Sequence, residues 1–279
     1  MTICRTIEEL RTVARGWRQE GLTVGFVPTM GYLHEGHLSL VDLAARNASR
    51  VVLSIYVNPT QFGANEDLSR YPRDFPRDEG LCRRRGVQAL FTPDSAAMYA
   101  PDHSTWVTEE ALTGTLCGRS RPEHFRGVTT VVTKLLNIVQ PEIAVFGRKD
   151  AQQALVIQRL VRDLDLPVRI IVGPIVRDPD GLALSSRNLY LSADERTRAL
   201  SISQALREAE DRYARGERDA LALRRWVQDR VQAAGGRIDY VDCVCRSTLQ
   251  PLDRIQGPAL LAVAAFFGRT RLIDNAYLG

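Results

Sequence analysis

Strand-like and helix-like segments alternate through the first two-thirds of this chain, and this alternation constrains its fold more than any other feature. Short apolar runs typical of buried strands are separated by stretches whose apolar residues recur at helical spacing. Such alternation predicts an α/β fold with a parallel sheet covered by helices on both faces. The strand candidates are residues 24–28, 51–57, 89–92, 143–146 and 168–172, and the helix candidates are residues 34–47, 77–86, 127–139 and 152–163.

The pattern changes after about residue 176. Ser192 and Glu195 have the spacing of a capping box, which predicts the start of a helix that runs to about residue 214. A second helix is expected to end near residue 234, and two strands are expected at 238–244 and 260–266. We therefore expect two domains: residues 1–176 with the parallel sheet, and residues 177–279 as a smaller α+β domain.

The composition excludes several classes of protein. The 279 residues suffice for a substantial core, and the net charge of +4 is too small to indicate nucleic-acid binding. The N-terminus is too charged for a signal peptide, and the longest apolar run, 259–267, is too short to cross a bilayer, so we expect a cytoplasmic protein. The five cysteines are scattered and odd in number, which argues against a disulfide framework. Cys243 and Cys245 are read as small strand residues rather than metal ligands.

Polar side chains follow three of the predicted strands, at the edge where parallel sheets bind ligands. The first group contains His34 and His37, which share one face at the start of a helix because they are three residues apart. A helix N-terminus favours anions, so this pair predicts a site for a phosphate whose charge grows during reaction. The alternative is a solvated turn without function.

Three further segments carry candidate site residues. Gln61 follows the second strand and offers both a donor and an acceptor. Lys149 is notable because, of 37 basic residues, all but Lys134 and Lys149 are arginine. Its segment, 146–153, has two interpretations. It either binds phosphate and a metal ion, or it is an ordinary charged start of a helix with Asp150 at the N-cap. The 180–188 segment, with two serines and an arginine, suits a polyphosphate on a flexible loop. The chain lacks the Gly-x-Gly-x-x-Gly and Walker A loops, and His34-Glu-Gly-His37 is too short for the zinc-protease motif.

Taken together, these segments resemble the pantothenate synthetase family, also called pantoate–β-alanine ligase. The resemblance covers nearly the whole chain and includes Tyr71-Pro-Arg, residues 121–128 and residues 271–275. The motifs that carry it are Val27-Pro-Thr-Met-Gly-Tyr-Leu-His-Glu-Gly-His37, Val57-Asn-Pro-Thr-Gln-Phe62, Phe146-Gly-Arg-Lys-Asp-Ala-Gln-Gln153 and Gly181-Leu-Ala-Leu-Ser-Ser-Arg-Asn188.

The resemblance implies a Rossmann-like nucleotidyltransferase domain with a smaller C-terminal domain that closes over the active site. It implies two steps: ATP and (R)-pantoate give pantoyl adenylate and pyrophosphate, and the amine of β-alanine then releases AMP. Mg²⁺ would be bound mainly through the ATP phosphates rather than by a protein metal site. Members are cytoplasmic homodimers, and no nucleic-acid or membrane partner is expected.

The resemblance also implies residue roles. His34, His37 and Lys149 would be catalytic, with His37 as proton donor and Lys149 on phosphate. Gln61 and Gln153 would bind pantoate, and Gln61 would also face β-alanine. Asp150 would lie near the ribose or the metal. The ATP site would be lined by Met30, Gly31, Tyr32, Leu33, His34, Glu35, Gly36, His37, Gly147, Arg148, Lys149, Asp150, Val176, Leu184, Ser185, Ser186 and Arg187.

Three positions depart from the family pattern. Arg148 replaces a usual Glu, Ala151 replaces a common aromatic residue, and Thr60 replaces a usual Met beside the pantoate pocket. Thr60 shortens an apolar wall, so weaker pantoate binding is expected, and Arg148 adds positive charge near ATP. Two rival interpretations are an adenylyltransferase acting on another cofactor precursor and a catalytically silent nucleotide-binding protein.

Overall fold

The computed structural model describes residues 1–64 and 66–279, which divide into two compact units. Unit 1 comprises Met1–Glu109, Glu123–Arg148 and Val156–Pro174. Unit 2 comprises Glu110–Pro122, Lys149–Leu155 and Ile175–Gly279, so two short segments from earlier in the chain belong with its C-terminal part. The expected domains, with their boundary at 176/177 and closure over the site, stay a prediction.

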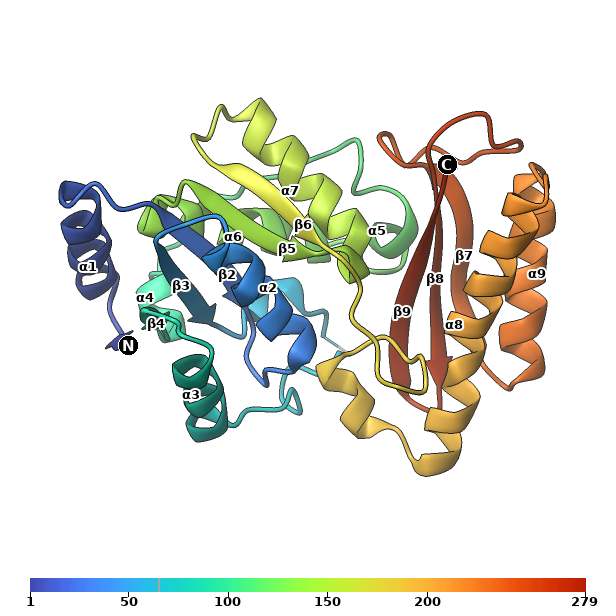
Figure 1. Cartoon of the computed structure of the whole chain (residues 1–279), viewed down its shortest axis with the longest axis horizontal. Helices are drawn as coiled ribbons and strands as arrows, with labels where there is room; N and C mark the ends of the chain where they lie inside the picture. The colour runs from blue at the N-terminus through green and yellow to red at the C-terminus, as the bar shows by residue number, and fades with distance from the viewer. Residues whose placement is uncertain (65) are drawn as a thin grey trace. The chain divides into compact units, whose positions relative to one another are not determined.

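Unit 1 contains a six-stranded parallel sheet in the order β1-β4-β3-β2-β5-β6 (Figure 1). This confirms the predicted α/β fold with its parallel sheet. The strands are β1 (Thr2–Cys4), β2 (Val24–Thr29), β3 (Arg50–Ile55), β4 (Ala89–Phe91), β5 (Ile143–Gly147) and β6 (Arg169–Gly173). The helices are α1 (Ile7–Gln19), α2 (Glu35–Ala45), α3 (Phe75–Arg84), α4 (Ser95–Met98) and α6 (His124–Val139), and α7 (Ala151–Asp163) connects β5 to β6.

Strand β1 and helix α1 were not predicted from the sequence. A three-residue strand at the sheet edge is too short to show a periodic pattern. The helix, however, carries a capping box: Glu9 N–H donates to Thr6 Oγ1 at 3.2 Å, and Thr6 N–H donates to Glu9 Oε2 at 3.1 Å. This spacing is a readable start signal for α1.

Both faces of the parallel sheet are buried. Helices α2 and α3 pack on one face, and α1 and α6 contact each other and β2. Because successive side chains of a strand point to opposite faces, each central strand supplies both faces and reads as a nearly continuous apolar run. The core under α2 and α3 includes Val27, Leu33, Leu40, Val41, Ala44, Leu53, Cys82, Leu90 and Val145.

The strand order creates a switch point between β2 and β5. The chain leaves β2 toward β3 on one side, and it leaves β5 toward β6 on the other. In open parallel sheets, ligands bind outside the carboxyl ends of strands at such a point. Residues 30–37 follow β2, and Gly147 and Arg148 end β5 or follow it, so the fold of unit 1 brings these segments to one edge of the sheet.

Unit 2 contains an antiparallel sheet of three strands, β7 (Arg237–Cys245), β8 (Ala259–Phe267) and β9 (Thr270–Leu278). Helices α8 (Ala193–Ala214) and α9 (Ala220–Ala233) pack on it, and α5 (Leu116–Ser120) contacts β7. The predicted capping box is confirmed, since Glu195 N–H donates to Ser192 Oγ at 3.2 Å. Strand β9 was missed because charged and polar residues, among them Arg271 and Asp274, interrupt its apolar pattern.

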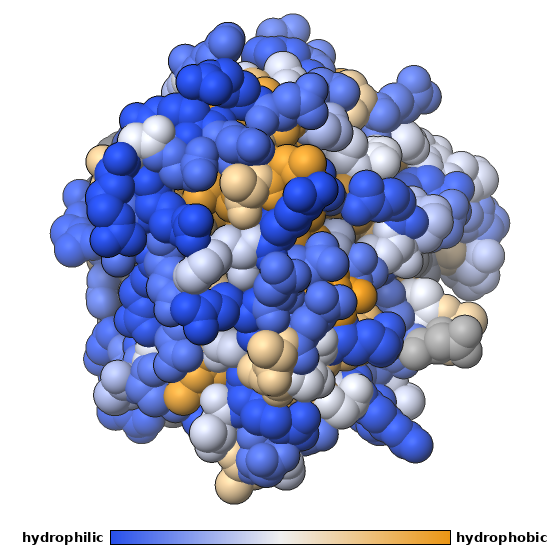
Figure 2. Space-filling view, turned by 90° about the vertical axis from the view of Figure 1, so that its right-hand side faces the viewer, coloured by the Kyte–Doolittle hydropathy of each residue, from blue (hydrophilic) through white to orange (hydrophobic). Residues whose placement is uncertain are grey.

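The visible surface on the side of α9 is mostly polar. Figure 2 shows charged and polar side chains over most of this face, with apolar areas that are small and interrupted. All five cysteines are free thiols. Among the helices of the described residues, none is both long and apolar enough to span a membrane.

Candidate functional site

The two predicted histidines stack on each other where α2 begins. His34 is the N-cap residue rather than part of the helix, and His37 lies in the first turn. Their ring centroids are 4.0 Å apart with an interplanar angle of 28°, and His34 N–H lies 3.4 Å from His37 Nδ1. The expected shared face is confirmed. Two imidazoles therefore stand side by side at a helix N-terminus, where the backbone already favours an anion.

The turn before His34 is held by a glycine and by a buried carboxylate from α3. Gly31 has φ +83°, and a Cβ there would lie 2.8 Å from Ile55 Cγ2. Asp78 accepts hydrogen bonds from the N–H groups of Tyr32 at 2.7 Å and Leu33 at 2.8 Å. Burial raises the pKa of Asp78, while these two hydrogen bonds and Arg77 oppose the rise. Asp78 therefore fixes the backbone that leads directly into the histidine pair.

Sequence reasoning missed Asp78, although a signal existed. It stands four residues before Cys82, which is fully buried in the core, so both lie on the inward face of α3. A carboxylate on the buried face of an amphipathic helix must bind something. Here it binds the turn that precedes α2.

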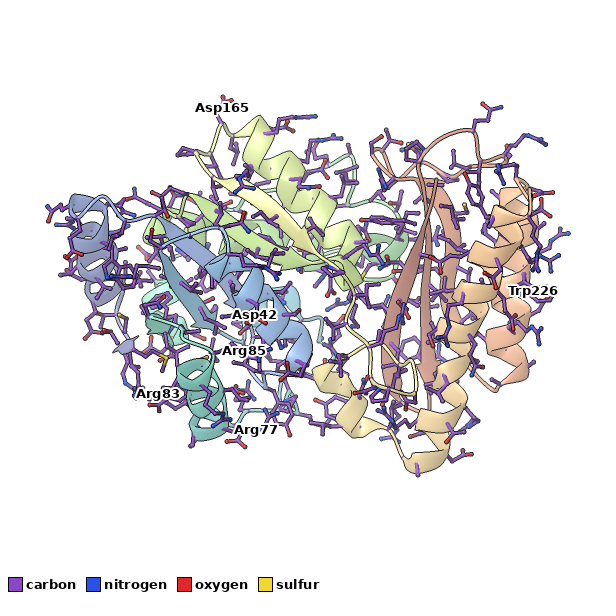
Figure 3. All side chains as sticks on the ribbon, viewed as in Figure 1. Asp42, Arg77, Arg83, Arg85, Asp165 and Trp226 are labelled. Carbon is purple, nitrogen blue, oxygen red and sulfur yellow. The ribbon has the colours of Figure 1, made fainter. Side chains whose placement is uncertain are left out.

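An arginine at the end of α3 links that helix to α2. Arg85 forms ion pairs with Glu35 at 2.8 Å and with Asp42 at 3.0 Å, and Figure 3 shows Asp42 and Arg85 facing each other. These pairs are partly exposed, so each is worth about 1 kcal/mol at most. Glu35 is thus engaged by Arg85, and the side chain of Leu33 is fully buried, which leaves only the backbone of Leu33 for a ligand.

Gln61 is held in one orientation by its neighbours. It ends the short 3₁₀ turn Pro59–Gln61 after β3. Asn58 Nδ2 donates to Gln61 Oε1 at 3.2 Å, Gln61 Nε2 lies 3.1 Å from Met30 Sδ, and His124 Nδ1 lies 2.9 Å from the Gln61 carbonyl. The amide of Gln61 therefore presents its NH₂ group toward Met30, beside the segment that carries the histidines.

Gly127 permits this arrangement. A Cβ on Gly127 would lie 2.7 Å from the backbone nitrogen of Gln61 and would overlap the carbonyl group of Thr60. Only glycine lets α6 approach the 3₁₀ turn this closely. No role for the family motif at residues 121–128 was predicted from the sequence. In the structure, Gly127 permits the close approach of α6, and His124 contacts the Gln61 carbonyl.

Thr60 is part of a polar cluster rather than an apolar wall. Its Oγ1 donates to Asn58 Oδ1 at 3.0 Å and lies 3.3 Å from Tyr99 Oη, and Tyr99 Oη also donates to Asn58 Oδ1 at 3.0 Å. Burial raises the pKa of Tyr99, which keeps its hydroxyl a neutral donor. Two hydroxyl groups, from Thr60 and Tyr99, therefore hold Asn58, which in turn orients Gln61. The Thr60 hydroxyl is present because threonine replaces the usual Met of the family at this position.

Lys149 lies in unit 2, within a 3₁₀ turn that spans Arg148–Asp150 and precedes α7. The residue is half-buried. Burial lowers the pKa of Lys149; Arg187 and Arg271 lower it further, whereas Asp150 and Asp274 raise it. The Lys149 carbonyl accepts a hydrogen bond from Asn275 Nδ2 at 3.1 Å.

The predicted polyphosphate loop forms a hairpin followed by a 3₁₀ turn. Arg177 and Ala183 form an antiparallel bridge, and Leu184 N–H donates to the Val176 carbonyl at 3.0 Å. The turn Ser186–Tyr190 begins at Ser185, whose Oγ accepts from Arg187 N–H at 3.2 Å. These contacts bring Val176 together with the segment 184–187.

The neighbouring glutamines of α7 have different surroundings. Gln152 is buried, and its side-chain amide forms hydrogen bonds with three backbone groups. It donates to the carbonyls of Leu112 and Thr115 at 2.8 and 2.9 Å and accepts from Cys117 N–H at 3.0 Å. Gln153 is half-buried and lies in the same unit as Lys149. Gln152 therefore holds the 112–117 segment, whereas the role of Gln153 in substrate binding stays a prediction.

The predicted site residues thus fall into two sets, one in each unit. We call residues 30–37 with Gln61, Gly147 and Arg148 the histidine set, in unit 1. The lysine set, in unit 2, contains Lys149, Asp150, Gln153, Val176, Leu184, Ser185, Ser186 and Arg187.

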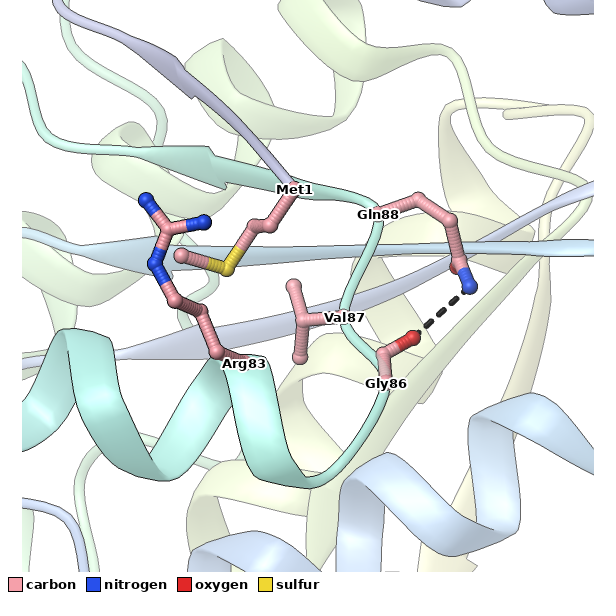
Figure 4. A pocket seen from close by; sticks show the side chains of 5 residues that line it. All are labelled: Met1, Arg83, Gly86, Val87 and Gln88. Carbon is pink, nitrogen blue, oxygen red and sulfur yellow. Dashed lines mark hydrogen bonds between the residues drawn. The ribbon is translucent and has the colours of Figure 1, made fainter.

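A cavity of about 420 Å³ in unit 1 contains neither set. It is lined by Met1, Arg83, Gly86, Val87 and Gln88, and Gln88 Nε2 donates to the Gly86 carbonyl across its rim (Figure 4). Within the described ranges, no group of three or more His, Cys, Asp or Glu side chains is arranged to hold a metal ion.

Comparisons with known proteins agree along the whole chain. Residues 2–277 match the family described as Pantoate-beta-alanine ligase. The pantothenate synthetase of Pelotomaculum thermopropionicum is 54% identical, with 100% of this chain and 99% of that protein covered. The pantothenate synthetase of Thermus thermophilus superposes with a TM-score of 0.93 at 44% identity, with 99% of both chains covered. A pantoate–β-alanine ligase from Francisella tularensis, complexed with β-γ ATP and β-alanine, has a TM-score of 0.84 at 32% identity, with 99% and 97% covered.

Proposed function

We propose a reaction for this chain from one premise: it belongs to the pantoate–β-alanine ligase family. It is an ATP-binding ligase of pantothenate biosynthesis. The proposed reaction condenses (R)-pantoate with β-alanine in two steps, through a pantoyl adenylate. The observation that carries this proposal is the pair of stacked histidines at the N-terminus of α2, beside the switch point of the parallel sheet.

In the first step, a carboxylate oxygen of pantoate attacks the α-phosphorus of ATP, and the bond from that phosphorus to the bridging oxygen of pyrophosphate breaks. Negative charge grows on the non-bridging and leaving oxygens. His34 and His37 are proposed to donate to this charge, with His37 as the proton donor. Lys149 and Arg187 are proposed to bind phosphate as fixed cations. Preorganised donors of this kind are usually the largest single term in such catalysis.

In the second step, the amine of β-alanine attacks the acyl carbon of the mixed anhydride. The carbon–nitrogen bond forms, the amine loses a proton, and AMP leaves with the electron pair of the broken carbon–oxygen bond. Gln61 is proposed to bind pantoate and to face the incoming amine, and Gln153 to bind pantoate. The network of Asn58, Thr60 and Tyr99 supports this role, because it fixes which end of the Gln61 amide is the donor.

Mg²⁺ is included in the proposal as the ion that arrives with ATP. It retains several waters and binds largely through substrate phosphates, so a protein cage of carboxylates is not required. When bound, it would neutralise phosphate charge. By family resemblance, we also propose a cytoplasmic homodimer.

The test is ATP–pyrophosphate exchange with Mg²⁺, measured with and without (R)-pantoate, followed by AMP release on addition of β-alanine. We expect exchange to require pantoate and AMP release to require both substrates. A stable adenylylated product without amide formation would instead identify an adenylyltransferase. ATP binding without any exchange would identify the silent nucleotide-binding protein and overturn the proposal.

A further inference from the structure

We propose that Asp274 and Asn275, neighbouring residues of β9, are positioning residues that hold the two segments of the lysine set. Asn275 holds Lys149, and Asp274 holds the hairpin that leads into residues 184–187. The inference rests on the proposed function, because it assumes that Lys149 and Arg187 bind the phosphates of ATP. Residues 271–275 were part of the family resemblance, but no role for them was predicted from the sequence.

Asn275 fixes the backbone from which the Lys149 side chain extends. Its side chain is 3% exposed, and its Nδ2 donates to the Lys149 carbonyl at 3.1 Å, across 126 residues of sequence. Lys149 lies within a single 3₁₀ turn, which has few internal hydrogen bonds of its own. An external bond to its carbonyl therefore sets where the lysine side chain begins.

Asp274 fixes the hairpin through Arg177. Its carboxylate, 4% exposed, accepts two hydrogen bonds from the Arg177 guanidinium, at 2.6 and 3.0 Å. Arg177 Nη1 also donates to the Gly181 carbonyl at 3.2 Å, and Arg177 bridges to Ala183 within the hairpin. A bidentate arginine–carboxylate pair restricts orientation as well as distance. Leu184, the next residue, therefore starts from a fixed position.

The pleat of β9 explains why two adjacent residues can serve two segments. Successive side chains of a strand point to opposite faces. Asp274 shares its face with Leu272 and Ala276, which belong to the hydrophobic core of unit 2, and Asn275 shares the other face with Arg271. The backbone pairing of β9 with β8 does not need either side chain. Apolar residues would suit these buried positions better, so the polar pair is retained for what it binds.

The first test compares Asn275→Ala and Asn275→Asp with the wild type. Both variants remove the donor to Lys149, and the second keeps the shape of the side chain. We expect either change to raise the KM for ATP or lower kcat by about 10- to 100-fold, because misplacing a phosphate-binding group by about 1 Å costs on this order. The KM for pantoate should change less than threefold, since the bond that is lost goes to Lys149, which is proposed to bind phosphate rather than pantoate.

The matched control is Thr270→Val in the same strand. Thr270 is 5% exposed and lies at the start of β9, far along the strand from Asn275. The bonds that hold Lys149 and the hairpin come from Asn275 and Asp274 rather than from Thr270, so the KM of this variant for ATP should equal that of the wild type. Thermal unfolding of each variant measures the loss of stability separately from the loss of ATP affinity.

The second test is Arg177→Lys, which keeps the charge but cannot form the bidentate pair. We expect a three- to tenfold higher KM for ATP, again with the KM for pantoate unchanged. Normal ATP kinetics in both Asn275 variants would overturn the inference. An equal increase in KM for all substrates, seen also in Thr270→Val, would overturn it as well, because it indicates a purely structural role. Failure of the Asn275 variants to fold would overturn it for the same reason. A wild type without pantoate-dependent exchange would instead refute the proposed function.

Discussion

The histidine set and the lysine set are positioned in different ways. His34 and His37 are placed by β2, the following turn and α2, which are consecutive in sequence, and the main distant contribution is Asp78, about 45 residues away. Lys149 and residues 184–187 are placed by β9, through contacts that span 97 and 126 residues. The comparison teaches that a strand–turn–helix unit can position its own side chains, whereas side chains on separate turns need a distant strand to hold them.

The largest effect should come from the histidine set itself. His37→Ala removes a donor to the charge that grows in the first step, so kcat for pantoate-dependent exchange should fall by about 10²–10³-fold. The melting temperature should stay close to that of the wild type, because His37 is half-buried rather than part of the core. Exchange within tenfold of the wild type would mean that the stacked histidines are not the catalytic donors.

Asp78, which fixes the turn before the histidines from a distant part of the chain, supplies the next prediction. Asp78→Ala removes the acceptor of the buried Leu33 N–H and of the part-buried Tyr32 N–H, and each such loss costs about 1–3 kcal/mol. We expect urea denaturation to show a free energy of unfolding lower by about 2–4 kcal/mol. Asp42→Ala is a suitable control, because its exposed ion pair with Arg85 should contribute less than about 1 kcal/mol. An equal decrease in the free energy of unfolding in the two variants would show that Asp78 contributes no more than a surface ion pair.

The charged side chain of Lys149 should lower the free energy of unfolding at neutral pH, although it is needed for the proposed reaction. Above pH 10.5 the lysine is neutral in both the folded and the unfolded protein. Because burial lowers its pKa in the folded state, stability is lost as the pH falls from there through the folded pKa. Lys149→Met should therefore be about 1 kcal/mol more stable at pH 7 and equal near pH 11, while losing activity. Urea denaturation at both pH values measures this difference, and a less stable variant at pH 7 would contradict it.

The smallest effect is expected at Thr60. Thr60→Val removes one of two hydroxyl groups that bind Asn58, and Tyr99 remains to hold it. The KM for pantoate should rise by about two- to fivefold, which corresponds to one neutral hydrogen bond. Combining Thr60→Val with Tyr99→Phe removes both hydroxyl groups and should exceed the sum of the single changes. Strict additivity would show that Asn58 does not transmit the effect to Gln61.

Sequence patterns predicted the central sheet and the histidine pair because both depend on residues close together in the chain. The apolar runs of β2, β3 and β5 and the spacing of His34 and His37 are local signals. The roles of Asp78 and Asn275 were missed because each acts on a segment that it reaches only after folding. Asn58 acts on nearby Gln61, but its own orientation depends on Tyr99, 41 residues away. Strand β9 was missed for a related reason: the polar residues that interrupt its apolar pattern include Asp274 and Asn275, which hold the lysine set.

The discontinuity of unit 2 has a consequence for anyone who divides this protein into pieces. Because unit 2 includes Glu110–Pro122 and Lys149–Leu155, a cut after residue 176 does not separate two complete bodies. The C-terminal fragment would lack Gln152 and the 112–117 segment that Gln152 binds. Expression trials, split-reporter fusions and limited proteolysis should therefore treat the chain as indivisible at that boundary, and insertions are better placed in an exposed turn such as the one around Gly216.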